Sequence, residues 1–212
     1  PTLGELKGKV LGVTLYGTVN DATMRLLLNK LGVDPERDVR LIQVGDSAPV
    51  VATSLIAGKT FDGALLQPPY YHKAVEAGMR VFANMEEMDI PFQQAGLNTT
   101  QKYIAKNHDV VRRVVKSIVE GVQLIRANPT VPKRAIARYM KIKDEKVLED
   151  SYQQLKATAE IKPYPSAEGF KTILDELAKK LPAARSANPA DFMDLRFIQE
   201  LDKSGYIDSL YK

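Results

Sequence analysis

The chain has 212 residues, of which 44% are hydrophobic and 26% are charged, and its formal net charge is +4. This is the composition of an ordinary globular protein, long enough to bury a core without disulfides or metals. The sequence has no cysteine, which excludes disulfides, thiolate metal sites and a cysteine nucleophile. The positive charge is weak and dispersed, with no block of like charges and no basic stripe interleaved with aromatics, so we expect no nucleic-acid partner.

The first half of the sequence alternates between strand and helix signals. Short apolar runs predict strands over residues 9–14, 38–44, 61–66 and 80–83. Apolar residues at helical spacing, punctuated by glycine or proline, predict helices over residues 20–31, 49–58 and 70–77. This β-α-β-α-β-α-β order predicts a mainly parallel sheet with helices on both faces.

The pattern changes after about residue 100. A long helix is predicted over residues 107–127, with an apolar stripe of valine and isoleucine. Further helices are predicted over residues 131–140, 144–157 and 166–181, and last elements near 191–193 and 195–204. No strand is predicted after residue 98. The chain therefore reads as an α/β unit followed by an all-helical unit, whose apolar stripes need a surface to cover.

The loop after the first predicted strand is the first candidate ligand site, because ligands of open parallel sheets bind beyond the carboxyl ends of the strands. Backbone N–H groups at the start of the following helix favour an anion there. Gly17 permits close approach of the backbone, and Thr18 and Asn20 offer hydrogen bonds. The alternative is a simple helix cap by Thr18 or Asn20, which needs no ligand.

Two further loops are expected at the same sheet edge. Gly45 and Asp46 precede the next helix, where capping by Asp46 or Ser47 is the favoured role. Gln67, Pro68 and Tyr70 belong to a segment whose double proline predicts a rigid rim with amphipathic side chains facing a cleft. The alternative for this segment is a stiff strand exit with Tyr70 packed on the surface.

The sequence offers little for catalysis. His72 and His108 lie on predicted helices without a nearby nucleophile or metal-ligand spacing. The carboxylates before Pro91, including Glu87 and Asp89, are better explained as a solvated turn. Neither a P-loop nor a G-x-G-x-x-G motif is present. We therefore expect no enzymatic activity, no catalytic residues, no metal and no cofactor.

The ordered segments nevertheless resemble a known family. The solute-binding proteins of ABC importers of the nitrate/sulfonate/taurine type, a group that includes thiamine-pyrimidine binders, contain stretches similar to LKGKVLGVTLYGTVNDATMRLLLNKLGVDPERDVRLIQVG and GKTFDGALLQPPYYHKAVEAGMRVFANM. The later segments VVRRVVKSIVEGVQLIRANP, YPSAEGFKTILDELAKKLP and PADFMDLRFIQELDKSGY resemble the long helix and the C-terminal helices of the same proteins. The resemblance covers nearly the whole chain, although none of its motifs is diagnostic alone.

The resemblance implies a fold and a function. Residues 1–95 would form an α/β ligand-binding lobe of the periplasmic-binding-protein type II, with a mainly parallel sheet. Residues 96–212 would form a helical region that completes the first lobe of a two-lobed clamshell, and the return hinge would lie at residues 89–97. Ligand contacts would come from the loop holding Tyr16, Gly17, Thr18, Asn20 and Asp21, and from Gln67, Pro68 and Tyr70, with Gly45 and Asp46 as weaker candidates.

By the same resemblance the protein would capture a small anionic or polar solute outside the cytoplasm, in the periplasm of bacteria that have one, and deliver it to a membrane permease. A lipid anchor is compatible with a full-length parent. If Asp21 faced the pocket, a zwitterion such as taurine would be favoured over a pure anion.

The sequence also departs from the family. The strand-rich first lobe that precedes the LKGK segment in family members has no counterpart here, so we expect a fragment. Its uncovered apolar helix surface is then expected to drive homodimerisation or exchange of elements between copies. Two other functions stay open: a pyrimidine binder or thiamine-pyrimidine biosynthetic enzyme on the same fold, and the effector domain of a transcription regulator.

Overall fold

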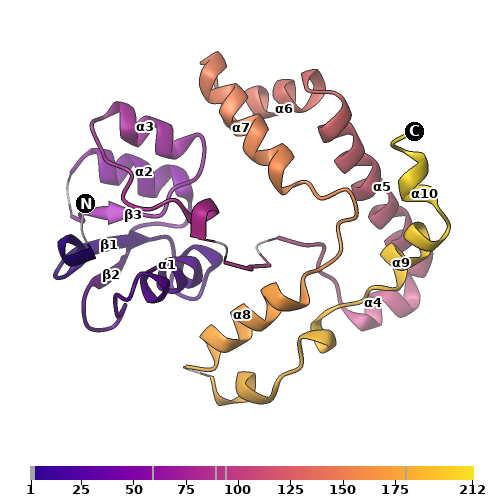
Figure 1. Ribbon diagram of the computed structural model, residues 1–212, viewed down its shortest axis with the longest axis horizontal. Helices are drawn as coiled ribbons and strands as arrows, with labels where there is room; N and C mark the ends of the chain where they lie inside the picture. Colours follow the sequence, from indigo (N-terminus) through magenta and orange to yellow (C-terminus); the bar gives the residue numbers. More distant parts are fainter. Residues whose placement is uncertain (1–2, 59, 89, 94, 180) are drawn as a thin grey trace. The chain divides into compact units, whose positions relative to one another are not determined.

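The computed structural model describes residues 3–58, 60–88, 90–93, 95–179 and 181–212. The chain divides into two compact units, Pro1–Ile90 and Pro91–Lys212 (Figure 1). The boundary between two domains that the sequence suggests, between residues 95 and 96, stays a prediction.

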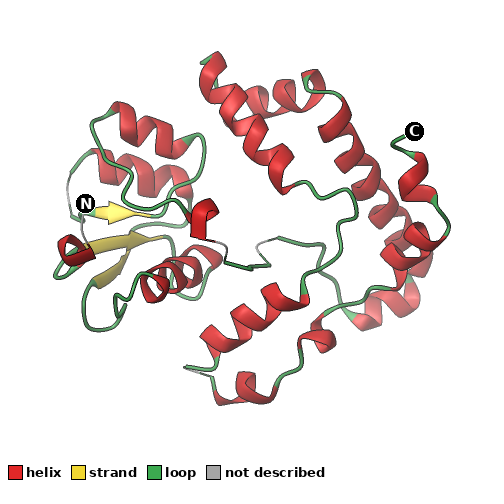
Figure 2. Cartoon of the chain, in the orientation of Figure 1, coloured by secondary structure: helices red, strands yellow, loops and turns green. Residues whose placement is uncertain are grey.

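The first unit is built on a three-stranded parallel sheet (Figure 2). The strand order is β2-β1-β3, so β1 is central and pairs with both neighbours. Each strand is followed by a helix, as the sequence predicted. In chain order the elements are η1 (Leu3–Leu6), β1 (Val10–Val13), α1 (Val19–Lys30), β2 (Arg40–Gln43), α2 (Ala48–Ile56), β3 (Gly63–Ala64), α3 (Tyr70–Glu76) and η2 (Met85–Met88).

Helices cover both faces of this sheet because successive strand residues point in opposite directions. Leu11 and Val13 of β1 pack with Met24 and Leu28 of α1 in one buried cluster. On the opposite face, Val51, Leu55 and Phe61 form a second cluster with side chains from all three strands. A Cβ on Gly12 would lie 2.6 Å from the Phe61 ring, so the bare backbone of β1 makes room for that ring.

Two strand predictions need correction. Residues 80–83 form no strand, and the side chain of Val81 is 58% exposed, so burial does not favour pairing of this segment. The predicted third strand, residues 61–66, is reduced to Gly63 and Ala64. The side chain of Asp62 accepts the N–H of Val10 instead of leaving it to solvent, which ties the start of β1 to the start of β3.

The second unit is helical, and the residues described after residue 98 contain no strand. The predicted long helix is α5 (His108–Ala127), and the other predicted helices are found within a few residues of their expected bounds except that α8 ends earlier. Sequence patterns missed α4, α10 and η3. The elements are α4 (Gln101–Lys106), α5, α6 (Thr130–Met140), α7 (Glu145–Thr158), α8 (Ala167–Leu177), η3 (Pro182–Ser186), η4 (Pro189–Phe192), α9 (Arg196–Lys203) and α10 (Tyr206–Ser209).

Only part of the apolar surface of α5 is covered. Val119 packs with Ile198, Leu201 and Ile207 from the last two helices. A second row at helical spacing, Val110, Val114 and Ile118, is exposed. The apolar stripe read from the sequence is therefore wider than the contacts that α5 makes within its own unit.

The segment that enters the second unit is fixed against the start of α8. The side-chain oxygen of Gln93 accepts the N–H of Ser166 at 2.7 Å. A Cβ on Gly169 would lie only 2.6 Å from the backbone nitrogen of Gln93, so the segment runs directly over the glycine. Asp89 and residue 94 lie outside the described residues, and the hinge role of residues 89–97 stays a prediction.

No helix in the described part of the chain combines the length and the apolar character needed to cross a membrane.

Candidate functional site

Three loops leave the sheet of the first unit at the same edge. Because β1, β2 and β3 are parallel, their carboxyl ends meet on one side of the sheet. Residues 14–18 lead from β1 into α1, residues 44–47 lead from β2 into α2, and residues 65–69 lead from β3 into α3. The structure thus brings the sequence-predicted loops together, and this edge is the candidate site.

Asn20 joins two of these loops. Its side-chain oxygen accepts the N–H of Thr14 at 3.0 Å, just beyond the end of β1. Its side-chain nitrogen donates to the carbonyl of Leu65 at 3.3 Å, just beyond the end of β3. Both ends of this amide are therefore engaged within the protein, and its first role is to hold the loops in register.

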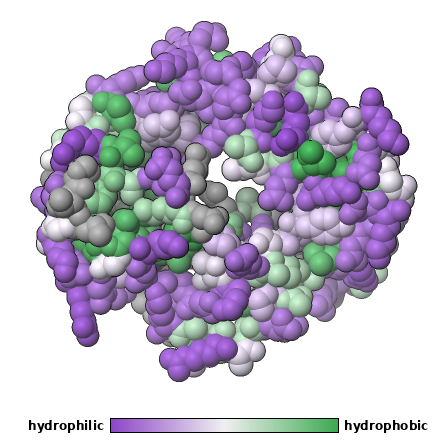
Figure 3. Space-filling view, viewed as in Figure 1, coloured by the Kyte–Doolittle hydropathy of each residue, from purple (hydrophilic) through white to green (hydrophobic). Residues whose placement is uncertain are grey.

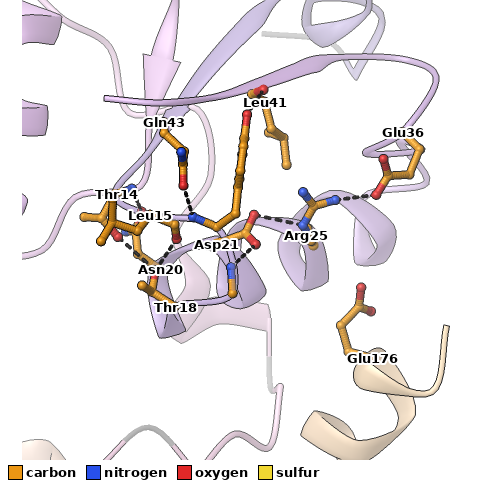
Figure 4. A network of polar contacts seen from close by, with 12 residues as sticks. Thr14, Leu15, Thr18, Asn20, Asp21, Arg25, Glu36, Leu41, Gln43 and Glu176 are labelled. Carbon is orange, nitrogen blue, oxygen red and sulfur yellow. Dashed lines mark hydrogen bonds and ion pairs between the residues drawn. The ribbon is translucent and has the colours of Figure 1, made fainter. Parts of the chain in front are cut away.

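Asp21 is also engaged internally (Figure 4). Its side chain is buried, with 5% of the residue exposed. One carboxylate oxygen accepts the N–H of Gly17 at 2.9 Å, and the other pairs with Nε of Arg25 at 2.8 Å. Arg25 reaches on to Glu36 at 2.5 Å. The negative charge of Asp21 is therefore paired with Arg25 inside the protein. The preference for a zwitterionic ligand that the sequence suggested depended on Asp21 facing the pocket, and the structure does not place it so.

Tyr16 is fastened at two points yet keeps its ring in solvent. Its N–H donates to the side-chain oxygen of Gln43 at 2.7 Å, and its hydroxyl donates to the carbonyl of Leu41 at 2.9 Å. The residue is nevertheless 51% exposed. Since its polar atoms are occupied by the protein, the ring is the part of Tyr16 that is available to a ligand.

The helices at this edge begin without side-chain caps. Thr18 occupies the N-cap position of α1, but its side chain accepts no hydrogen bond from the first turn. Its hydroxyl donates to the carbonyl of Leu15 instead. Ser47 at the start of α2 likewise makes no side-chain cap bond. The capping roles that the sequence suggested for Thr18 and Ser47 are therefore wrong, and the N-cap side chains leave the first N–H groups of both helices to other partners.

The other predicted site residues differ in accessibility. Gly45 serves packing, because an added Cβ would lie 2.5 Å from Val50, whereas Asp46 is exposed. The side chain of Gln67 is exposed, and its carbonyl accepts the N–H of Tyr70 at 2.8 Å. Pro68 is buried, which leaves it unable to line an open rim, and Tyr70 is half-buried.

Sequence analysis missed the apolar side chains at this edge. Leu15 and Val19 flank the first loop and Val50 lies in the first turn of α2, and all three are exposed. They lie beside the uncapped helix starts, so the edge offers apolar surface next to backbone N–H groups. The sequence could have indicated them, because large apolar residues stand out in loops and in the first turns of helices.

A comparison of the sequence with protein-family models gives a match that includes the whole α/β unit described above. The model of the NMT1-like family matches residues 3–141, about two thirds of the chain. The chain belongs to the NMT1-like family.

Relatives of this NMT1-like chain carry names that refer to binding. Proteins of Brucella abortus (strain 2308) and Brucella suis biovar 1 (strain 1330) are each named as candidate binding proteins and are 27% identical to it over 144 residues. The match covers 66% of this chain but only 44% of each relative. The chain therefore spans less than half the length of the curated relatives it matches.

Solved structures share the fold of the NMT1-like chain. A protein of Bordetella bronchiseptica RB50 superposes with a TM-score of 0.67 at 18% identity, over 94% of this chain and 65% of that one. The alkanesulfonate-binding protein SsuA from Xanthomonas axonopodis pv. citri, bound to MOPS, superposes with a TM-score of 0.58 at 18% identity, over 87% of this chain and 60% of that one. The predicted resemblance and the predicted α/β periplasmic-binding-protein fold with a helical C-terminal region are confirmed.

Each histidine of this NMT1-like chain lies beside an aromatic ring. His72 in α3 is half-buried, and its ring centroid lies 3.9 Å from that of Tyr71. His108 at the start of α5 lies 4.8 Å from the Phe197 ring. In the ranges that the structure describes, no group of three or more histidine, aspartate or glutamate side chains is arranged to hold a metal.

Proposed function

We propose that the chain is part of a solute-binding protein of an ABC importer and that the carboxyl edge of its parallel sheet holds the anionic group of a small solute. The observation that carries this proposal is the pair of helix starts, α1 and α2, that reach the same edge without a side-chain cap. Backbone N–H groups and the helix dipole favour an anion at such a place.

The contacts made by the polar side chains at this edge support an anionic ligand over a zwitterionic one. Asp21, the carboxylate in the first turn of α1, is buried and its charge is already paired with Arg25, so it is a poor partner for a ligand amine. The exposed ring of Tyr16 and the exposed side chains of Leu15 and Val19 suit the short apolar body of a sulfonate. The likeness to an alkanesulfonate-binding protein agrees with this choice among sulfonate, nitrate and taurine.

The relatives named above are binding proteins, which supports a role in capture rather than catalysis. Capture for import implies a membrane permease as the partner and a location outside the cytoplasm. We propose both on the strength of the family alone.

Val19→Asp tests the proposal without disturbing the fold. The new carboxylate would lie in the first turn of α1, where the helix dipole favours it, so stability is expected to hold. The same charge repels an anionic ligand. Titration calorimetry with methanesulfonate, nitrate and taurine is expected to show at least a roughly tenfold loss of affinity in Val19→Asp, and a much smaller loss in the neutral control Val19→Asn.

The same assay separates the alternatives. A pyrimidine that binds equally to both variants would favour the pyrimidine-binder reading. If none of these compounds binds the wild-type chain or raises its melting temperature, the proposed function is wrong for this chain.

A further inference from the structure

The helix α6 carries a basic face that the sequence analysis, which judged the charge dispersed, did not find. Arg134 and Arg138 are four residues apart and share one side of α6, and Lys141 is the left-handed residue that follows the helix directly. Lys143 follows two residues later. All four side chains, hereafter the basic face, are exposed. Hydrophilic residues cover the region of α6 and α7 in Figure 3.

The cations of the basic face are not neutralised within the protein. In the described parts of the chain, no carboxylate lies within 4.0 Å of any of them, whereas Lys133 on the same helix pairs with Glu149 and Lys162 pairs with Asp202. Residues 133–146 contain six Lys or Arg and two Asp or Glu. This stretch alone carries a net charge of +4, equal to the formal net charge of the whole chain.

Helix stability does not account for this arrangement. A cation near the last turn of a helix is stabilised by the dipole, and that covers Arg138 and Lys141. Arg134 lies more than a turn before the end of α6 and gains little from the dipole. Tyr139, between the cations, is 79% exposed, and the guanidinium of Arg138 lies 5.7 Å from its ring centre.

We infer that the basic face binds the surface of an anionic phospholipid membrane. No side-chain hydrogen bond within the described residues fixes these four cations, so they can adapt to phosphates at changing positions. Long basic side chains and an amphipathic aromatic residue are the groups that favour the headgroup region of a bilayer. A nucleic-acid strand would call for several stacking aromatics, and the basic face has one.

The inference is independent of solute binding, because it concerns α6 and not the edge of the sheet. The test is cosedimentation of the full chain, without solute, with vesicles of phosphatidylcholine alone or with roughly a third of phosphatidylglycerol. Binding is expected only to the anionic vesicles, and it is expected to fall as salt screens the charges.

A matched pair of variants locates the contact. The test variant changes Arg134, Arg138, Lys141 and Lys143 to Gln, and the control changes the exposed residues Lys102, Lys106, Lys203 and Lys212 to Gln, so both lose the same charge. Each cation near an anionic surface contributes about fivefold to the partition coefficient, so the test variant is expected to bind at least about a hundredfold more weakly. The control variant is expected to keep most of its binding to anionic vesicles. The single change Tyr139→Ser is expected to weaken the binding of the otherwise wild-type chain to the same vesicles.

Three results would overturn the inference. They are equal losses in the two quadruple variants, equal binding to neutral and anionic vesicles, and binding to polyglutamate without binding to vesicles. The last would identify an acidic protein surface as the partner. Circular dichroism of each variant shows whether the helices are retained.

Discussion

At the scale of single residues, several polar side chains of the candidate site already make hydrogen bonds or ion pairs within the protein. The side-chain amide of Asn20 bonds Thr14 through its oxygen and Leu65 through its nitrogen. The two carboxylate oxygens of Asp21 bond Gly17 and Arg25. A buried ion pair contributes little net stability, but removing one partner leaves an uncompensated charge. Around the start of α1, the groups left to a ligand are therefore mainly backbone N–H groups and apolar side chains.

Asp21→Asn is expected to lower the free energy of unfolding by about 2–3 kcal/mol. The amide oxygen can still accept the N–H of Gly17, but Arg25, whose side chain is only 12% exposed, would keep only Glu36 as a carboxylate partner among the described residues. Urea unfolding measures the change.

The control for this prediction is Glu36→Gln. The side chain of Glu36 is 58% exposed, so the change is expected to cost less than about 1 kcal/mol. Equal losses in the two variants would show that the pair between Asp21 and Arg25 has no special weight.

The sequence could place these residues but not assign their contacts. The pattern of a strand followed by a glycine turn and a helix correctly placed Thr18, Asn20 and Asp21 at the edge of the sheet that forms the candidate site. It could not show that Asn20 binds Leu65, 45 positions later in the chain, or that Tyr16 binds Gln43 in the next strand. Capping was predicted from residue type alone, and the hydroxyl of Thr18 found a nearer acceptor in Leu15.

At the scale of elements, glycines mark where backbone segments approach closely. Gly169 in α8 lies beneath residues 92 and 93, and Gly121 in α5 has no atom within 4 Å of an added Cβ. Both are helical positions, where alanine is preferred over glycine by roughly 0.5–1 kcal/mol when space allows.

The two glycines are expected to respond to alanine with opposite signs. Gly121→Ala should raise the free energy of unfolding by about 0.5–1 kcal/mol, since only the helix preference changes. Gly169→Ala should lower it by about 1–3 kcal/mol, because the methyl group would meet the backbone of Gln93. Thermal and urea unfolding of both variants measure the signs. Stabilisation by both would mean that the segment is not held against α8.

An ionic cluster ties the segment after α7 to the last two helices. Lys162 pairs with Asp202 at 2.7 Å and with Asp208 at 3.1 Å, and the hydroxyl of Tyr164 donates to Asp202 at 2.8 Å. The hydrogen bond from Lys162, followed by the one from Tyr164, holds the pKa of Asp202 below its ordinary value of 3.8.

This cluster predicts a loss of stability in acid. Since the folded-state pKa of Asp202 is depressed, its contribution is fully present above pH values near 4 and is lost as the pH falls through the folded-state pKa. Unfolding midpoints of the wild type and Asp202→Asn are expected to differ at neutral pH and to converge in acid. A difference that stays constant down to pH values near 2 would contradict this assignment.

The elements themselves were largely predictable, and the failures share a cause. Long helices such as α5 are predictable because apolar residues recur at helical spacing over several turns. The short run at residues 80–83 has strand-like composition, but pairing depends on a neighbour that local sequence does not reveal, and Val81 remains exposed. The short helices α4 and α10 are set by packing on α5 and α9 rather than by a periodic pattern.

At the scale of the whole molecule, the uncovered row on α5 is an exposed apolar surface. Val110, Val114 and Ile118 form a contiguous apolar stripe in a protein that spans only part of its relatives. Stripes of this kind usually meet another apolar surface. The sequence-based expectation of self-association stays a prediction.

Light scattering across micromolar concentrations tests that expectation. The wild-type mass is expected to rise above the 23.5 kDa of one chain as concentration increases. Val114→Lys is expected to remain at one chain, whereas Val75→Lys, which changes an equally accessible valine on α3, should associate like the wild type. A wild-type mass that stays constant would end the expectation.

The bond between Thr14 and Asn20 has a further consequence, for experiments that follow motion. The Thr14 amide lies beyond the last residue of β1, yet it is bonded to a side chain of α1. Its hydrogen can exchange with solvent only when this bond to the Asn20 side chain opens. The exchange rate of this single amide therefore reports how often this contact at the candidate site opens, and its slowing on addition of a compound would reveal occupancy without a label.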